Sequence, residues 1–283
     1  MKDFYYVLTH FFTHKDFLVD AKLIPGSAFT PLQFIFECVL IFIIIASAIF
    51  VAKHKKLIKP SFICLWCILI VWEIVMAFWD NTAGKTNSFD FVEGLSLYPC
   101  SLIMYTLPFI IWGKGIIKRI ACGYVFTLGL LGALVNFLFP IQRLNDYSCI
   151  SLPGFHTFFF HGSILWVFLV LIISGKHNYR NVYHWWELLL PSVASLIMSV
   201  PANVLNYSPL NSDYMYFKGH FFVLAAIFKG VPEVVITLII YGLYIIIPAL
   251  FYLPSYIRHN KYINGFIKQN ARAISSVFGR RAS

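Results

Sequence analysis

The chain has 283 residues, of which 59% are hydrophobic and only 12% are charged. A soluble domain is about 45–50% apolar and about 25% charged, so this chain has too few charged residues to cover a water-soluble core. The composition therefore excludes a soluble enzyme, a disordered chain and a fibrous protein. It predicts a multi-pass membrane protein.

The net charge of the chain is +10. In a soluble protein this charge would suggest nucleic-acid binding, but neither a basic stripe nor a known binding motif accompanies it. In a membrane protein, Lys and Arg collect in cytoplasmic loops and contact anionic lipid headgroups. We therefore expect no nucleic-acid partner. Five of the six cysteines lie in apolar runs, so we also expect no disulfide framework.

The first segment, residues 1–31, carries apolar residues at three- and four-residue spacing, which is typical of an amphipathic helix. These residues are Phe4, Val7, Leu8, Phe11, Phe12 and Leu18. Asp3 and Lys15 interrupt the segment, so it lacks the apolar core of a signal peptide. We expect an interfacial helix on the membrane surface, and a helix docked on the bundle fits the pattern equally well.

Residues 32–253 contain seven apolar runs, each close to the roughly 20 residues that a membrane-spanning helix needs. The runs are Leu32–Ala52, Ser61–Trp79, Leu95–Trp112, Ile120–Phe139, Phe155–Ser174, Trp185–Leu205 and Val231–Leu253. The sequence therefore predicts an all-α fold with seven transmembrane helices. A basic tail, residues 254–283, follows them.

The distribution of Lys and Arg predicts the orientation of these helices, because such residues favour the cytoplasmic side. Fifteen of the 22 Lys and Arg residues lie in the tail or in loops on the same side as the tail, and seven lie on the opposite side. We expect the N-terminus outside and the C-terminus in the cytoplasm. The expected location is the plasma membrane of the cell.

Polar side chains in the predicted helices gather in the half nearest the outside. They are Gln33, Glu37, Glu73, Cys100, Asn136, His156, His161, Asn203 and Glu233. Because polar groups inside a bilayer usually face a cavity or one another, this asymmetry predicts a polar chamber that opens toward the outer leaflet. A simple interfacial position explains the residues at helix ends. It does not explain Glu37, Glu73 and His161, which lie more than one turn inside.

Within this chamber, Cys100 and His161 form a candidate nucleophile and base. We expect them at similar depth, roughly 8 Å below the outer boundary, given a rise of about 1.5 Å per residue. A helix beginning near Pro99 would favour a Cys100 thiolate through its positive end. A cysteine with a histidine supports acyl transfer through a thioester, although a single membrane cysteine is more often a small packing residue.

Other polar residues have supporting roles in this hypothesis. Glu73, with Asp80 and Asn81, would orient His161, bind a cation or form a structural network. The amides of Asn136 and Asn203 are candidates to stabilise an oxyanion. The remaining chamber residues are Glu37, His156 and Glu233.

The sequence carries no Gly-rich phosphate loop, no catalytic carboxylate pair and no HExxH motif. Cys64-x-x-Cys67 stands without a second CxxC or a histidine pair nearby, so we interpret it as packing. We therefore expect neither a metal nor a cofactor.

Three short segments together resemble the YwaF-like integral membrane family. They are Leu97-Tyr98-Pro99-Cys100, Leu152-Pro153-Gly154-Phe155 with Phe158-Phe159-Phe160-His161-Gly162, and Asn203-x-x-Asn206 with Asn211-Ser212-Asp213-Tyr214-Met215-Tyr216. This family is related to a cysteine-dependent animal acyltransferase, transmembrane protein 164, which remodels ether phospholipids.

The resemblance implies a seven-helix fold with Cys100 as the acyl-accepting nucleophile and His161 as its base. His156 does not match the family position and ranks second. The resemblance also draws Asn206 and Tyr214 into the supporting set. The family usually has Asn-Tyr where this chain has Asp213-Tyr214.

These observations support three hypotheses. The first is a membrane-embedded acyltransferase or acyl hydrolase that acts on a phospholipid, a lysophospholipid or another fatty ester through Cys100 and His161. The second is a transporter or ligand-binding membrane protein whose outer chamber holds a polar solute between Glu37 and Glu73. The third is a receptor-like seven-helix protein, which the short cytoplasmic loops disfavour.

Overall fold

The computed structural model describes residues 11–13, 29–82, 100–139, 147–177, 182, 184–205 and 230–260. These residues form helices and turns and contain no strand. The helices are α3 (Pro31–Lys53), η2 (Lys55–Leu57), α4 (Ile58–Thr82), α5 (Ile103–Trp112), α6 (Gly115–Phe126), α7 (Leu128–Leu138), α9 (Leu152–Ile173), α10 (Trp186–Leu205) and α12 (Glu233–His259). The all-α prediction is confirmed for this part of the chain, and each of the seven predicted spans contains a helix.

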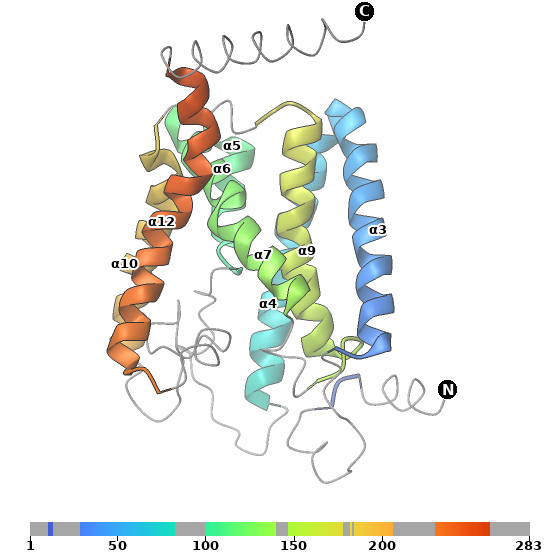
Figure 1. Ribbon diagram of the computed structural model, residues 1–283. Helices are drawn as coiled ribbons and strands as arrows, with labels where there is room; N and C mark the ends of the chain where they lie inside the picture. The colour runs from blue at the N-terminus through green and yellow to red at the C-terminus, as the bar shows by residue number, and fades with distance from the viewer. Residues whose placement is uncertain are drawn as a thin grey trace, which may run out of the picture.

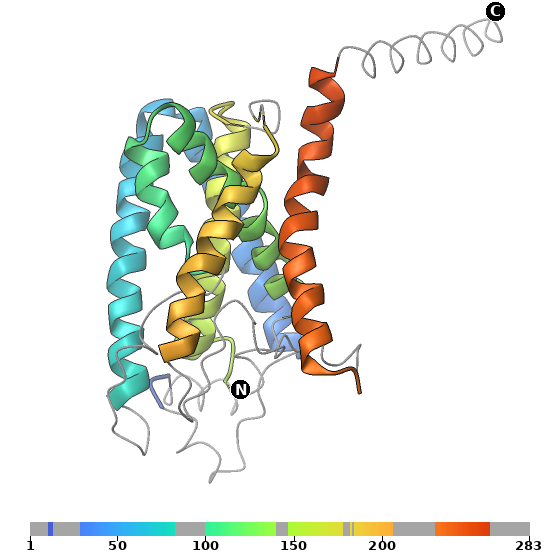
Figure 2. The same ribbon diagram turned by 90° about the vertical axis from the view of Figure 1, so that its left-hand side faces the viewer.

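The helices lie side by side in one bundle (Figure 1). α9 is central, because it packs against α3, α7 and α4, while α10 packs against α6 and α12. Figure 2 shows α4 and α12 at opposite edges of the bundle. The aromatic rings of Phe36, Phe137 and Phe158 meet where α3, α7 and α9 converge.

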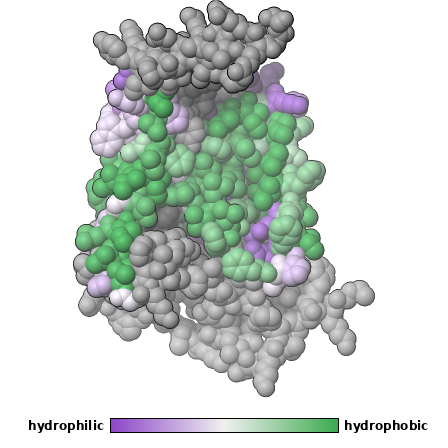
Figure 3. Space-filling model, viewed as in Figure 1, coloured by the Kyte–Doolittle hydropathy of each residue, from purple (hydrophilic) through white to green (hydrophobic). Residues whose placement is uncertain are grey.

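Four helical segments are long and apolar enough to cross a membrane: Pro31–Lys53, Lys55–Trp79, Gly115–Leu138 and Leu152–Ile173. Ile103–Trp112 and Trp186–Met198 are shorter apolar helices. Large apolar side chains on the outer faces are exposed, for example Phe42 at 73% and Leu238 at 63%. Figure 3 shows a hydrophobic band on the face in view, with hydrophilic patches near its two ends. In a bilayer this band contacts lipid tails, so the chain is a membrane protein.

The fourth predicted span, Ile120–Phe139, is not one continuous helix. It begins earlier, at Gly115, and breaks at Thr127, where φ is −129° and ψ is −95°. The buried Thr127 hydroxyl donates to the carbonyl of Gly123 at 2.6 Å, and such bonds compete with the helix ladder. The break redirects α7 so that it packs against α9.

The third predicted span is also wrong in its bounds. Residues 95–99 lie outside the described part of the chain, Cys100–Leu102 form a turn, and α5 begins only at Ile103. With ten residues, α5 is about 15 Å long, which is half of a hydrocarbon core about 30 Å thick. Cys100 therefore lies in the turn before α5 and not one turn inside a helix.

The terminal segments can be compared with the structure only in part. Of residues 1–31, the structure describes only 11–13 and 29–31. At the other end, α12 continues to His259, six residues beyond the predicted end of the last span. The remainder of the basic tail lies outside the described residues.

Every Lys and Arg among the described residues lies at one end of the bundle, called the basic end below. These residues are Lys53, Lys55, Lys56, Lys59, Lys114, Lys118, Arg119, Lys176 and Arg258. They lie where α3, α5, α9 and α12 finish and where α4 and α6 start. The opposite end, where α3 and α9 start and α4 finishes, is called the site end.

Close packing and an ion pair with a buried carboxylate join α6 to α10 near the basic end. A Cβ atom added to Gly123 would lie 2.4 Å from the carbonyl oxygen of Glu187, so only glycine allows this approach. Arg119 Nε donates to Glu187 Oε2 at 3.1 Å, and the Glu187 side chain is fully buried. The arginine therefore supplies the opposite charge that a buried carboxylate requires.

We predict that Gly123→Ala destabilises the protein, because the new methyl group must push α10 away from α6. Overpacking of this kind costs about 1–3 kcal/mol. The matched control is Gly132→Ala, where an added Cβ has no atom within 4 Å and only the helix propensity improves. Thermal unfolding of the purified variants in detergent should show a lower midpoint for the first and an unchanged or higher midpoint for the second. Equal midpoints would contradict the close approach.

We also predict that Arg119→Met costs about 3–5 kcal/mol, because it leaves the buried Glu187 carboxylate without its partner charge. The double variant Arg119→Met with Glu187→Leu should recover much of this loss, since an apolar pair needs no compensation. Lys56→Met, at an exposed position, serves as the control for removing one positive charge. A double variant as unstable as the single one would show that the ion pair does not account for the effect.

Candidate functional site

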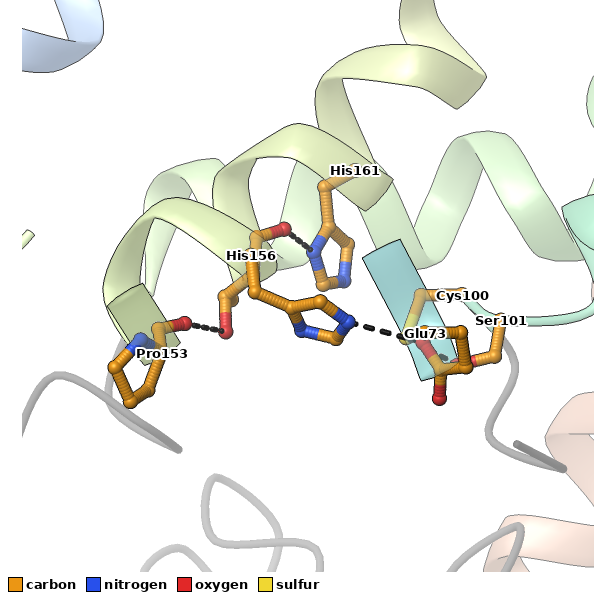
Figure 4. Close-up of polar contacts among 7 residues, drawn as sticks. Glu73, Cys100, Ser101, Pro153, His156 and His161 are labelled. Atoms are coloured by element: carbon orange, nitrogen blue, oxygen red, sulfur yellow. Dashed lines mark hydrogen bonds and ion pairs between the residues drawn. The ribbon is translucent and has the colours of Figure 1, made fainter. Parts of the chain in front are cut away.

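Side chains from three elements gather in one region of the bundle (Figure 4). Glu73 comes from α4, Cys100 and Ser101 come from the turn before α5, and His156 and His161 come from α9. The structure thus places the predicted cysteine and histidine in the same cluster, together with two further residues of the predicted set. Among the described residues, Cys100 Sγ makes no hydrogen bond to either imidazole.

Two hydrogen bonds, one from α6 and one from the start of α5, hold the turn that carries Cys100. The hydroxyl of the fully buried Tyr124, on α6, donates to the backbone carbonyl of Cys100 at 3.3 Å. The carbonyl of Ser101 accepts the backbone N–H of Met104 at 3.0 Å, which connects the turn to the start of α5. Cys100 therefore has a fixed backbone directly before the positive end of a helix.

Ser101 is a neighbour that the sequence argument missed. Its side chain is buried, and its hydroxyl lies 4.0 Å from Cys100 Sγ. A polar residue directly after a candidate nucleophile is the signal that could have identified it. The hydroxyl can donate to the sulfur or accept from it.

His161 is held in one tautomer by its own helix. Its Nδ1 lies 2.6 Å from the backbone carbonyl of Thr157, and the ring is buried. A carbonyl can only accept a hydrogen bond, so Nδ1 carries a proton. In the neutral ring, Nε2 is then the unprotonated nitrogen, which is the atom a base uses. The hydroxyl of Thr157 donates in turn to the carbonyl of Pro153 at 3.0 Å, in the first turn of α9.

Glu73 pairs with His156. The distance from His156 Nε2 to Glu73 Oε2 is 2.9 Å, and 14% and 20% of the two side chains are exposed. That Glu73 orients His161 stays a prediction, while its ion pair with His156 joins it to α9. Two residues five positions apart on a helix point about 140° away from each other, and His156 is the one that faces α4. The side chains of Asp80 and Asn81 lie outside the described part of the chain.

Aromatic rings form one wall beside the histidines. The ring of Trp72, next to Glu73 on α4, packs against Phe155 and Phe159 of α9, with centroids 5.7 and 5.8 Å apart. The indole Nε1 of Trp72 is buried and has no hydrogen-bond partner. The site therefore has an apolar wall, in which the indole N–H of Trp72 is a hydrogen-bond donor without a partner.

The other predicted site residues lie elsewhere or cannot be placed. Glu37, on α3, accepts a hydrogen bond from Gln33 Nε2 at 2.7 Å, one turn away on the same helix. Asn136, on α7, has a buried amide nitrogen without a partner. Asn203 and Glu233 are in α10 and α12, but their side chains lie outside the described part of the chain, as do Asn206 and Tyr214 entirely.

Within the described residues, no group of three or more His, Cys, Asp or Glu side chains is arranged to hold a metal ion. Cys64 and Cys67 are exposed on α4. The chemistry of the cluster is thus that of a thiol, two imidazoles and a carboxylate.

Comparison with known proteins identifies the family. A model of the TMEM164 family matches residues 28–255. The match covers most of the chain, so the protein belongs to the TMEM164 family, and the relation suggested by the sequence motifs is confirmed. No curated protein and no solved structure matches the chain.

Proposed function

We propose that this member of the TMEM164 family is a membrane-embedded acyltransferase or acyl hydrolase that acts on phospholipids through a thioester at Cys100. The observation that carries the proposal is the hydrogen bond between His161 Nδ1 and the carbonyl of Thr157. It prepares Nε2 as a base in the same cluster as a thiol. Membership of the family adds support but does not by itself assign the chemistry.

In the first half of the proposed reaction, His161 Nε2 takes the thiol proton while Cys100 Sγ attacks the ester carbonyl of a phospholipid. The tetrahedral intermediate then collapses, and the lysolipid alcohol leaves with the proton from His161. In the second half, a lysophospholipid hydroxyl or a water molecule attacks the thioester and frees the thiol. Because the site is buried, proton transfer and attack must occur together, so that no isolated thiolate forms.

The negative oxygen of the intermediate needs a donor. The amide of Asn136 and the indole of Trp72 are buried donors without partners. We keep Asn203, Asn206 and Tyr214 as further candidates for this role or for orienting the substrate. Glu37 and Glu233 remain candidates for the chamber that admits the lipid.

The proposed orientation places the basic end in the cytoplasm. The described Lys and Arg residues all lie at that end, which the preference of Lys and Arg for the cytoplasmic side explains. The N-terminus is then outside, residues 32–253 form the transmembrane domain, and residues 254–283 form a cytoplasmic tail. The site opens toward the outer leaflet of the plasma membrane, with residues 1–31 at its surface.

We predict that Cys100→Ala abolishes acyl exchange, because it removes the nucleophile. The assay uses the full chain in vesicles of phosphatidylethanolamine and phosphatidylglycerol with an alkyne-tagged acyl chain, and lysophosphatidylethanolamine as the acceptor. A tagged, hydroxylamine-sensitive thioester should form on the wild-type protein and should be absent from Cys100→Ala. The controls are Cys64→Ala and Cys67→Ala, at exposed positions, which should retain both the label and the exchange.

Undiminished exchange by Cys100→Ala would refute the thioester mechanism. Release of a tagged free fatty acid without a transferred product would identify a hydrolase. If the protein moves a polar solute across the vesicle membrane, and this uptake survives Cys100→Ala but fails with Glu73→Gln, it is a transporter.

A further inference from the structure

His156, like His161, has one ring nitrogen held by a hydrogen bond. The nitrogen that is held is Nε2 in His156 and Nδ1 in His161. A carboxylate oxygen accepts the hydrogen bond at 2.9 Å, so Nε2 of His156 carries the proton. The nitrogen that can exchange a proton in the neutral ring is therefore Nδ1, which faces away from Glu73. In Figure 4 the two imidazoles lie in one cluster, and Glu73 lies beside Cys100.

The carboxylate of this pair is more exposed than the carboxylate of the Arg119–Glu187 pair. In that pair Glu187 is fully buried, and the Arg119 side chain is 32% exposed. Here both side chains are partly exposed, 14% for His156 and 20% for Glu73. The described Lys and Arg residues all lie at the basic end, and the imidazole that the structure places against Glu73 is that of His156.

The charge of Glu73 decides in which half of the reaction the pair can act. While His156 is neutral, the carboxylate repels any negative charge that develops on the neighbouring sulfur. The pair is thus a poor activator of the free thiol. Once the sulfur is acylated, the thioester carries no charge and this repulsion disappears. When His156 then accepts a proton, the pair becomes neutral as a whole and no longer opposes the negative charge that develops on the sulfur, which takes up a proton as it departs.

Building on the proposed function, we propose that His156 is a second catalytic base, which activates the acyl acceptor, and that Glu73 is its positioning residue. The acceptor O–H attacks the thioester carbon and gives its proton to His156 Nδ1. The new C–O ester bond forms and the C–S bond breaks. The sulfur takes up one proton from the chamber, and His156 returns one there. No group is oxidised or reduced. In the first half of the reaction His161 takes the proton of the thiol, and in the second half His156 takes the proton of the acceptor hydroxyl.

The test separates the two half-reactions in the vesicles described above, with tagged phospholipid as the donor and lysophosphatidylethanolamine as the acceptor. His156→Gln keeps a side chain that can donate to Glu73 but cannot act as a base. It should form the tagged thioester at Cys100 and accumulate it, while transfer slows by about 100-fold or more, which is the usual contribution of a general base. His161→Gln should fail to form the thioester.

Hydroxylamine provides the matched control, because it is a strong nucleophile that needs no base. It should discharge the thioester of His156→Gln as fast as that of the wild type, which also shows that the site is intact. Glu73→Gln should still form the thioester but should change the pH dependence of transfer. This second variant keeps the proposal testable if His156→Gln does not fold.

Two results would overturn the assignment of His156. One is transfer at the wild-type rate by His156→Gln, and the other is equal loss of thioester formation and transfer in that variant. Failure of the proposed function itself looks different, because the wild-type protein would then form no thioester at all.

Discussion

The hydrogen bond from His161 Nδ1 to the carbonyl of Thr157 is the interaction on which the proposed chemistry depends. Many catalytic histidines are fixed by a carboxylate, but a carboxylate deep in a bilayer carries a large desolvation cost. A backbone carbonyl of the same helix fixes the ring without introducing a charge. It can accept both the ladder N–H and the ring N–H, because a carbonyl oxygen has two lone pairs. Because the ring is bonded to the backbone of α9, the helix determines the orientation of the base.

The position of α9 in the bundle extends this constraint to the other site residues. Because α9 packs against both α3 and α4, its histidines cannot rotate without disturbing two interfaces. Gly162, next to His161, allows a close approach to α3, since an added Cβ would lie 2.9 Å from Ile44 Cδ1. Cys100 lies in the same region, in the turn before the short helix α5, and Tyr124 holds this turn. The site thus lies where α9, which is long enough to cross a membrane, meets the shorter α5.

The sequence predicted the helices well because a bilayer leaves few alternatives. Apolar runs of sufficient length must become helices there, and counting residues gives their approximate ends. Counting cannot reveal local breaks that depend on contacts. The bend at Thr127 and the start of α5 after Cys100 both involve Tyr124, whose ring packs on Gly129 and whose hydroxyl holds the Cys100 carbonyl. Neither contact leaves a periodic pattern in the sequence.

Residue counting also predicted one feature of the site and missed another. Counting placed His161 and Cys100 near each other along the helix axes, and Figure 4 shows them in one cluster. It could not give the rotation of α9 about its axis, which decides which histidine faces α4. The packing of Trp72 between Phe155 and Phe159 fixes that rotation and brings His156 to Glu73.

The Glu73 carboxylate is thereby balanced by the His156 imidazole in a region where a lone charge would be unstable, and the balance depends on the protonation of His156. A membrane site that must move protons without accumulating charge is well served by this arrangement, because each proton accepted by His156 neutralises a charge that is already present.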